Sequence, residues 1–149
     1  MAPDSTTLDQ IVAIVGLREA QGDVARTALR HAEAALDRQQ ALERDHLAHR
    51  DQAWDAHLAR LGQPRPDPTI LHLSGTWLLG REQDLTAAQL DTAIAGQQRA
   101  QAASDMSLAS ARIDASREIR RTLCKVLAKA RDERQASEIA DRFLHRRWR

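Results

Sequence analysis

The chain has 149 residues, with 22 Lys and Arg against 21 Asp and Glu and a net charge of +1. Only 42% of the residues are apolar and many of these are Ala, so bulky core side chains are scarce. With no Tyr, one Phe, four Pro and six Gly, the composition argues against a β-sandwich or barrel, whose strands favour aromatic and β-branched residues. Abundant Ala, Leu, Arg, Gln and Glu favour helices. The composition therefore predicts an all-α fold packed through small residues.

Cysteine usage and apolar runs favour a cytoplasmic location. Cys124 is the single cysteine, so no internal disulfide can form. The first residues carry no basic leader, and the apolar run 11–17 is too short to cross a membrane. We therefore expect a cytoplasmic chain without stable membrane insertion.

Residues 7–61 are expected to form the first helix, because this segment lacks Pro and contains only two Gly. Thr7 and Gln10 match the capping box that starts a helix. Apolar or small residues recur every seven positions, the pattern then jumps by eleven, and it resumes in sevens. These positions are Leu8, Val15, Gly22, Leu29, Leu36, Leu47, Trp54 and Leu61. A heptad pattern with one four-residue stutter predicts a coiled coil that needs a partner helix.

Residues 62–85 are expected to form an irregular apolar loop at the tip of a hairpin. Gly62 fits a helix C-terminus, and the Pro residues at positions 64, 66 and 68 favour extended backbone. The large apolar residues that follow are Ile70, Leu71, Leu73, Trp77, Leu78 and Leu79. They are expected to fold back as a cap onto the helix ends, to form a docking tip, or to do both. Trp77 is the expected partner-facing anchor, with Leu78 beside it.

The second helix is expected at residues 86–148. Thr86 and Gln89 form a second capping box, and no Pro follows them. Two helices of similar length around one loop predict a single domain over residues 1–149, a long antiparallel two-helix coiled-coil hairpin. Cys124 is expected to be a small buried residue on or beside the inner face of this helix.

The charge distribution singles out the last part of the chain. Residues 117–149 carry eleven basic and five acidic side chains, a net charge of +6. The candidate partner-binding residues are Arg146, Arg147, Trp148 and Arg149, together with Trp77 and Leu78. An Arg-rich helix can bind nucleic acid, but interleaved acids such as Glu138 and Asp141 disfavour this. An acidic protein surface is the expected partner, and a merely solvated end is the alternative.

Few side chains have the spacing that catalysis or metal binding needs. Glu43, His46 and His49 lie at helical spacings, but a di-iron site requires a second such motif, which the sequence does not offer. The sequence also lacks a Gly-rich phosphate loop. We therefore expect no catalytic residue, no metal site and no cofactor, and hence a protein that is not an enzyme.

The later part of the chain resembles the second helix of the FliJ/YscO family, the central stalk proteins of type III secretion systems. The resemblance is carried by residues 111–118 (ARIDASRE), 130–134 (ARDER) and 136–140 (ASEIA), where paired acids precede a basic end. The Ala-rich pattern and the apolar mid-chain segment are most similar to members from Hrp-type systems. The three prolines in that segment depart from the plainest hairpins of the family.

The resemblance implies a non-enzymatic stalk that couples the secretion ATPase hexamer to the export gate and promotes protein export. It also implies a cytoplasmic location peripheral to the inner-membrane secretion apparatus, a role in virulence, and secretion chaperones as further partners. The sequence leaves two alternatives open. One is an oligomeric coiled-coil scaffold or chaperone-binding adaptor, which would self-associate. The other is a basic helical protein associated with nucleic acid.

Overall fold

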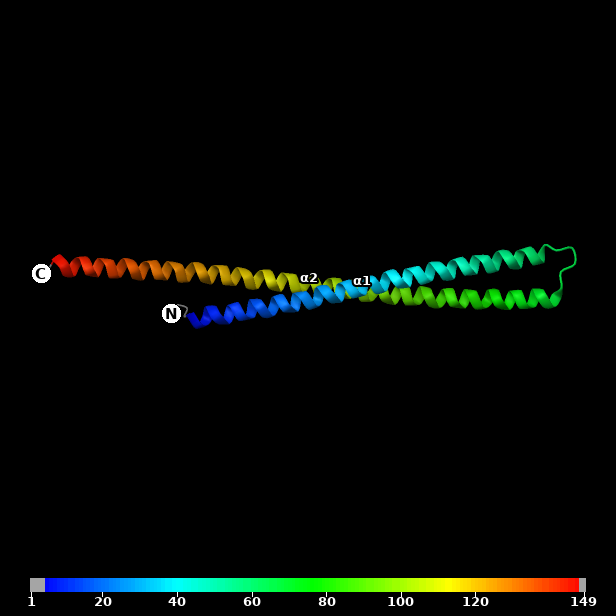
Figure 1. The fold of residues 1–149 in the computed structure, drawn as a ribbon, viewed down its shortest axis with the longest axis horizontal. Helices are drawn as coiled ribbons and strands as arrows, with labels where there is room; N and C mark the ends of the chain where they lie inside the picture. Colours follow the sequence, from blue (N-terminus) through cyan, green and yellow to red (C-terminus); the bar gives the residue numbers. More distant parts are fainter. Residues whose placement is uncertain (1–4, 148–149) are drawn as a thin grey trace. The chain divides into compact units, whose positions relative to one another are not determined.

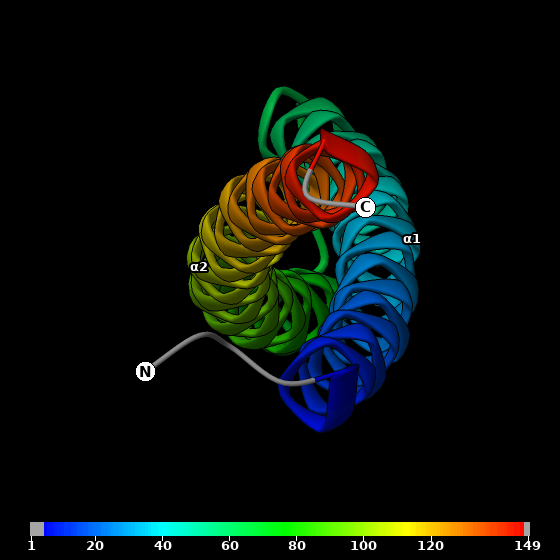
Figure 2. The same cartoon turned by 90° about the vertical axis from the view of Figure 1, so that its left-hand side faces the viewer.

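A computed structural model describes residues 5–147 of the chain, and the side chains of residues 6–143. It contains two helices, α1 (Ser5–Leu61, 57 residues) and α2 (Pro68–Arg147, 80 residues), and no strand within residues 5–147 (Figure 1). The prediction of an all-α helical hairpin is confirmed. The chain divides into two compact units. Unit 1 comprises Met1–Arg26 and Asp105–Arg149, and unit 2 comprises Thr27–Ser104. The α1 and α2 segments of each unit lie side by side in Figure 1, and Arg117–Glu19 in unit 1 and Arg50–Glu82 in unit 2 are contacts between them. Figure 2 shows the same helices viewed along their length.

A short turn over residues 62–67 joins the helices in unit 2. At the end of α1 the Gly62 N–H donates to the Leu58 carbonyl at 3.1 Å. At the start of α2 Asp67 is the N-cap, because its Oδ1 accepts the Thr69 N–H at 2.8 Å and its carbonyl accepts the Leu71 N–H at 3.0 Å. Pro68 follows at the first helical position, where the missing N–H of proline needs no partner.

The predicted irregular loop over residues 62–85 is wrong, and so is the predicted start of the second helix at Thr86. Asp67 and Pro68 are themselves a helix start signal, and the segment after them is helical. Thr86 lies inside α2, where its hydroxyl donates to the Glu82 carbonyl at 2.8 Å. Gly75 also lies inside α2, with no positive φ. The two helices are consequently of unequal length.

The least exposed side chains of each helix recur at alternating intervals of three and four residues, and we call these positions the seam. In unit 1 the seam includes Val15, which is 2% exposed, and Ile113, which is 9% exposed. The helices run antiparallel, because Glu19 contacts Arg117 while the later residue Gly22 lies against the earlier residue Ile113. A Cβ on Gly22 would lie 2.5 Å from the Ile113 Cδ1, so the glycine makes room for this side chain.

In unit 2 the seam continues with the same spacing but with different residues. On α2 it buries Leu78, Leu85, Ala88 and Ala95, together with the polar Ser74. On α1 it holds Ala53 and the half-buried side chains of Glu43, His46, Arg50, His57 and Arg60. The predicted four-residue stutter is therefore absent from the described part of α1. Leu47, Trp54 and Leu61, which the stutter would have placed inside, are 39%, 48% and 49% exposed.

Candidate partner-binding surfaces

An apolar row runs along one flank of α1, beside the seam, near the turn of unit 2. It consists of Leu47, Trp54, Leu58 and Leu61, each 39–49% exposed, and we call it the α1 stripe. At about 100° per residue these positions fall within a narrow sector of the helix surface. Apolar side chains gathered on one exposed face are typical of an interaction site, whereas isolated ones are ordinary.

Trp77 and Leu78, the two predicted tip anchors, point in different directions. Trp77 is 46% exposed, and the Arg81 guanidinium lies 5.4 Å from its ring centroid, a cation–π contact. Leu78 is 8% exposed and belongs to the seam. Ile70 and Leu73, at helical spacing from Trp77, are 48% and 62% exposed. Trp77 can therefore contact a partner directly, whereas Leu78 holds the two helices together.

The seam of unit 2 contains a polar network that the hydrophobic pattern did not reveal. Arg50 donates from Nε to Asp51 Oδ1 at 2.8 Å and from Nη1 to Glu82 Oε1 at 3.2 Å. The Glu82 hydrogen bond, with help from Asp51, raises the pKa of Arg50 above its ordinary value, although desolvation acts the other way. This guanidinium therefore stays charged across the physiological pH range and ties α1 to α2.

A second polar link lies one to two turns nearer the end of α1. The Ser74 hydroxyl donates to the Leu71 carbonyl at 3.0 Å, and His57 Nδ1 lies 2.7 Å from the hydroxyl oxygen of Ser74. Because the hydroxyl hydrogen is used, His57 Nδ1 is the donor to Ser74. Ser74 is only 5% exposed, so this hydrogen bond spares a buried hydroxyl the penalty of being unpaired.

Three other polar atoms in unit 2 are buried and lack a hydrogen bond to the described residues. His46 Nδ1, Arg81 Nε and Thr92 Oγ1 have no hydrogen-bond partner among the described residues. Each unpaired buried group lowers stability by about 1–3 kcal/mol. His46 is also part of the Glu43, His46 and His49 motif. Within residues 5–147, no three His, Cys, Asp or Glu side chains come close enough to hold a metal ion.

The C-terminal part of α2 is the second exposed region. Every side chain from residue 131 to residue 143 is exposed, including Ile139 at 54% and Phe143 at 71%. Figure 1 shows α2 continuing past the start of α1 in unit 1. Arg146 and Arg147 belong to α2, but their side chains are not among those described, and Trp148 and Arg149 lie outside the described residues.

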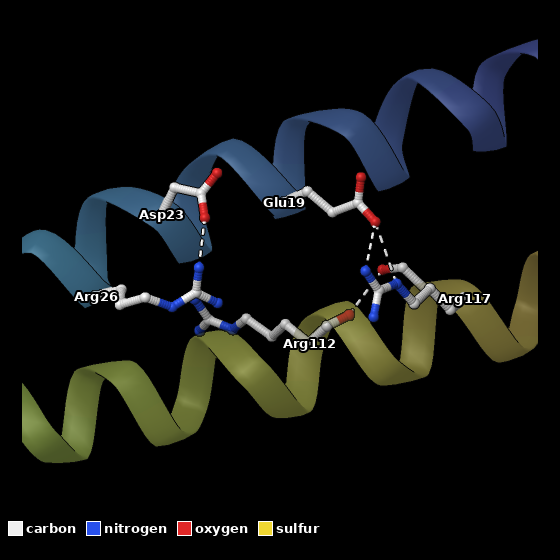
Figure 3. Close-up of polar contacts among 6 residues, drawn as sticks. Glu19, Asp23, Arg26, Arg112 and Arg117 are labelled. Carbon is white, nitrogen blue, oxygen red and sulfur yellow. Dashed lines mark hydrogen bonds and ion pairs between the residues drawn. The ribbon is translucent and has the colours of Figure 1, made fainter.

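Charged side chains border the seam of unit 1. Arg117 donates across from α2 to Glu19 on α1, with Nη2 at 2.7 Å and Nε at 3.1 Å (Figure 3). Within α1, Arg26 pairs with Asp23 at 2.8 Å, and Figure 3 shows the Arg112 side chain reaching toward them from α2. Glu19 and Arg117 remain roughly half exposed, so this pair sets the register more than it stabilises the fold.

Cys124 is exposed, so the expectation that it is buried is wrong. It lies one position beyond the half-buried Leu123, which occupies the seam instead. Over the described residues, neither helix has a stretch both long and apolar enough to span a bilayer. Comparison with protein-family models, characterised proteins and solved structures gave no match.

Proposed function

We propose that this chain is a stalk protein of the FliJ/YscO type, a coiled coil that links a secretion ATPase to the export gate of a type III secretion system. The observation that carries the proposal is the exposed end of α2. Residues 131–143 form helix, yet none of their side chains is covered by α1. Exposed Ile139 and Phe143 stand among charges in a region of net charge +6. A helix of this kind is suited to insertion into an acidic opening of a partner.

The side chains of the exposed C-terminal part of α2 favour binding to a protein partner over simple exposure to solvent. Lys129 pairs with Glu133 at 3.8 Å, but both side chains are strongly exposed and contribute little to stability. Such a helix gains stability only when a partner covers it, because most helical stability in proteins comes from tertiary packing. Arg and aromatic residues are also those that dominate binding energy at protein interfaces.

The decisive experiment looks for a secretion ATPase gene beside the gene for this chain and measures whether the chain stimulates the hydrolysis of ATP by that ATPase. One variant changes Arg146, Arg147 and Arg149 to Glu. Its matched control changes three exposed arginines of unit 2 by the same charge, Arg30, Arg38 and Arg65. The proposal expects the first variant to lose stimulation and the control to keep it, with helicity equal by circular dichroism. Equal stimulation by both variants, or the absence of a neighbouring secretion ATPase gene, would contradict it.

A second candidate function is favoured by the α1 stripe. Four large apolar side chains on one exposed face fit an oligomeric scaffold or a chaperone-binding adaptor. This function predicts self-association or chaperone capture that is lost on changing Trp54 and Leu58 to Gln. It also predicts that replacing the C-terminal arginines has no effect, so the two candidates are separated by the same set of variants.

A further inference from the structure

The α1 stripe is displaced from the seam by a constant step. Its four members each come one residue after a seam position of α1. The pairs are His46 with Leu47, Ala53 with Trp54, His57 with Leu58, and Arg60 with Leu61. One residue corresponds to about 100° around a helix. A rotation of α1 by this angle, without sliding, would turn the whole stripe toward α2.

The side chains that would meet the rotated stripe are already in place on α2. The contact of Arg50 with Glu82 fixes which levels of the two antiparallel helices face each other. Counting equally in opposite directions from that contact gives the pairs Leu47 with Leu85, Trp54 with Leu78, and Leu61 with Leu71. Leu78 and Leu85 are buried seam residues and Leu71 is half-buried. These three pairs are apolar, and the same count places the fourth stripe residue, Leu58, opposite the buried Ser74. Three of the four stripe residues therefore meet apolar side chains without a turn of α2.

The observed arrangement has both strengths and defects. It is held by the Arg50–Glu82 ion pair and by the His57–Ser74 hydrogen bond, which a rotation would break. Against these, it leaves the α1 stripe in water and buries His46 Nδ1 without a hydrogen-bond partner among the described residues. Rotation of α1 would carry His46 out of the seam into water. Each arrangement therefore satisfies the groups that the other leaves unsatisfied.

We infer that unit 2 switches between two pairings of the same helices. In the polar pairing the seam of α1 is formed by His46, Arg50 and His57, and in the rotated pairing Leu47, Trp54 and Leu61 pack on α2. The rotation is confined to the end near the turn, because the residues one step after the earlier seam positions are charged or polar, as at Glu33, Asp37 and Gln40. From His46 onward only Asp51, which follows Arg50, is charged among the residues that would enter the seam.

The switch controls which surface a partner meets. In the polar pairing the α1 stripe is exposed, and in the rotated pairing it is hidden against α2. A partner that binds the stripe stabilises the polar pairing, because a ligand shifts an equilibrium toward the state that it binds better. This inference does not depend on the proposed role in secretion.

The experiment uses paired cysteines in the full chain with Cys124 changed to Ser. His57→Cys with Ser74→Cys reports the polar pairing, and Leu47→Cys with Leu85→Cys reports the rotated one. Ala48→Cys with Leu85→Cys is the matched control, since position 48 faces away from α2 in both pairings. In a glutathione buffer both reporter pairs are expected to form intramolecular disulfides, the 47/85 pair at least about tenfold faster than the 48/85 control.

Further variants push the equilibrium in opposite directions. Arg50→Gln removes the link to Glu82 and should speed the 47/85 disulfide several-fold, whereas Leu58→Gln should slow it. Circular dichroism verifies that each variant remains helical. The inference is overturned if the 47/85 pair reacts no faster than the 48/85 control. It is equally overturned if the cysteine introduced by Leu47→Cys cross-links only between chains, which would show that a second copy covers the stripe.

Discussion

Unit 1 and unit 2 share the same three-and-four spacing of seam positions, but α1 places more polar side chains at these positions in unit 2, above all near the turn. Unit 1 places Val15 in the seam opposite α2, where Ile113 is also buried. Unit 2 places His46, Arg50 and His57 there and leaves Trp54 outside. Apolar burial is the main source of stability in a helix pair, whereas polar seam residues set register and alternative states. The comparison indicates that α1 is held mainly by apolar contacts in unit 1 and to a larger extent by polar links in unit 2.

The largest expected effect breaks the apolar seam of unit 1. Ile113→Ala removes a buried side chain and should lower the free energy of unfolding by about 2–4 kcal/mol. Ile119→Ala is the matched control in the same helix, because Ile119 is 58% exposed and its loss should change stability by less than about 0.5 kcal/mol. Denaturant unfolding followed by circular dichroism measures both. Equal losses would mean that Ile113 is not a core residue.

The next effect tests the close approach at Gly22. Gly22→Leu places a side chain against the Ile113 Cδ1 and should lower the free energy of unfolding by about 1–3 kcal/mol. Gly16→Leu is the control, because a Cβ at Gly16 meets nothing within 4 Å. There the higher helix propensity of Leu should raise stability by roughly 0.5–1 kcal/mol. The prediction fails if the two substitutions change the melting temperature in the same direction.

A third change sharpens the comparison by making the seam of unit 2 apolar. His46→Leu removes a buried nitrogen that lacks a partner among the described residues, and adds apolar contact. It should raise the free energy of unfolding by about 1 kcal/mol. His49→Leu serves as the control, because His49 is exposed and its replacement should be neutral. A destabilising effect of His46→Leu would show that His46 contributes favourably to the seam.

The smallest effect concerns the ion pair of Glu19 with Arg117. A double-mutant cycle with Glu19→Gln and Arg117→Gln should give a coupling free energy of about 0.5 kcal/mol, because both side chains are roughly half exposed. The coupling should fall at about 1 M salt, where charges are screened beyond about 3 Å. A coupling that exceeds about 2 kcal/mol or ignores salt would show that the pair is shielded from water.

The spacing of apolar residues in the sequence correctly predicted two helices. The predictions failed for the start of α2 and for the stutter, where two sequence signals point to different structures. Long segments that lack Pro and have helical spacing of apolar residues indicated these two helices. The start of α2 was misplaced because three prolines favoured a loop, although Asp67 and Pro68 form a helix start signal. The stutter was predicted because hydrophobicity points to Leu47 and Trp54, whereas the seam in the structure is held by ion pairs and hydrogen bonds between residues distant in sequence.

The candidate binding residues show the same division. The exposure of Trp77 follows from its place on the outer side of α2, while Leu78, its neighbour in sequence, is buried. Sequence reasoning treated the two alike because it assigned them to a loop, where no helical face separates adjacent residues. The polar links of Arg50 and His57 carry no hydrophobic signal. Arg50 and His57 lie at the same heptad position as Leu29 and Leu36. Continuing the heptad count past Leu36 without a stutter would therefore have identified both as seam residues.

Hydrogen–deuterium exchange resolved along the chain tests the contrast between the two units most directly. The account predicts that backbone amides of residues 8–26 of α1, in unit 1, exchange more slowly than those of residues 39–60 of α1, in unit 2, because local stability follows apolar burial and the later α1 segment places mainly polar side chains in the seam. Within unit 1, residues 131–143 should exchange fastest, since their side chains are uncovered. Equal protection of the two α1 segments, or greater protection of residues 39–60, would contradict the account.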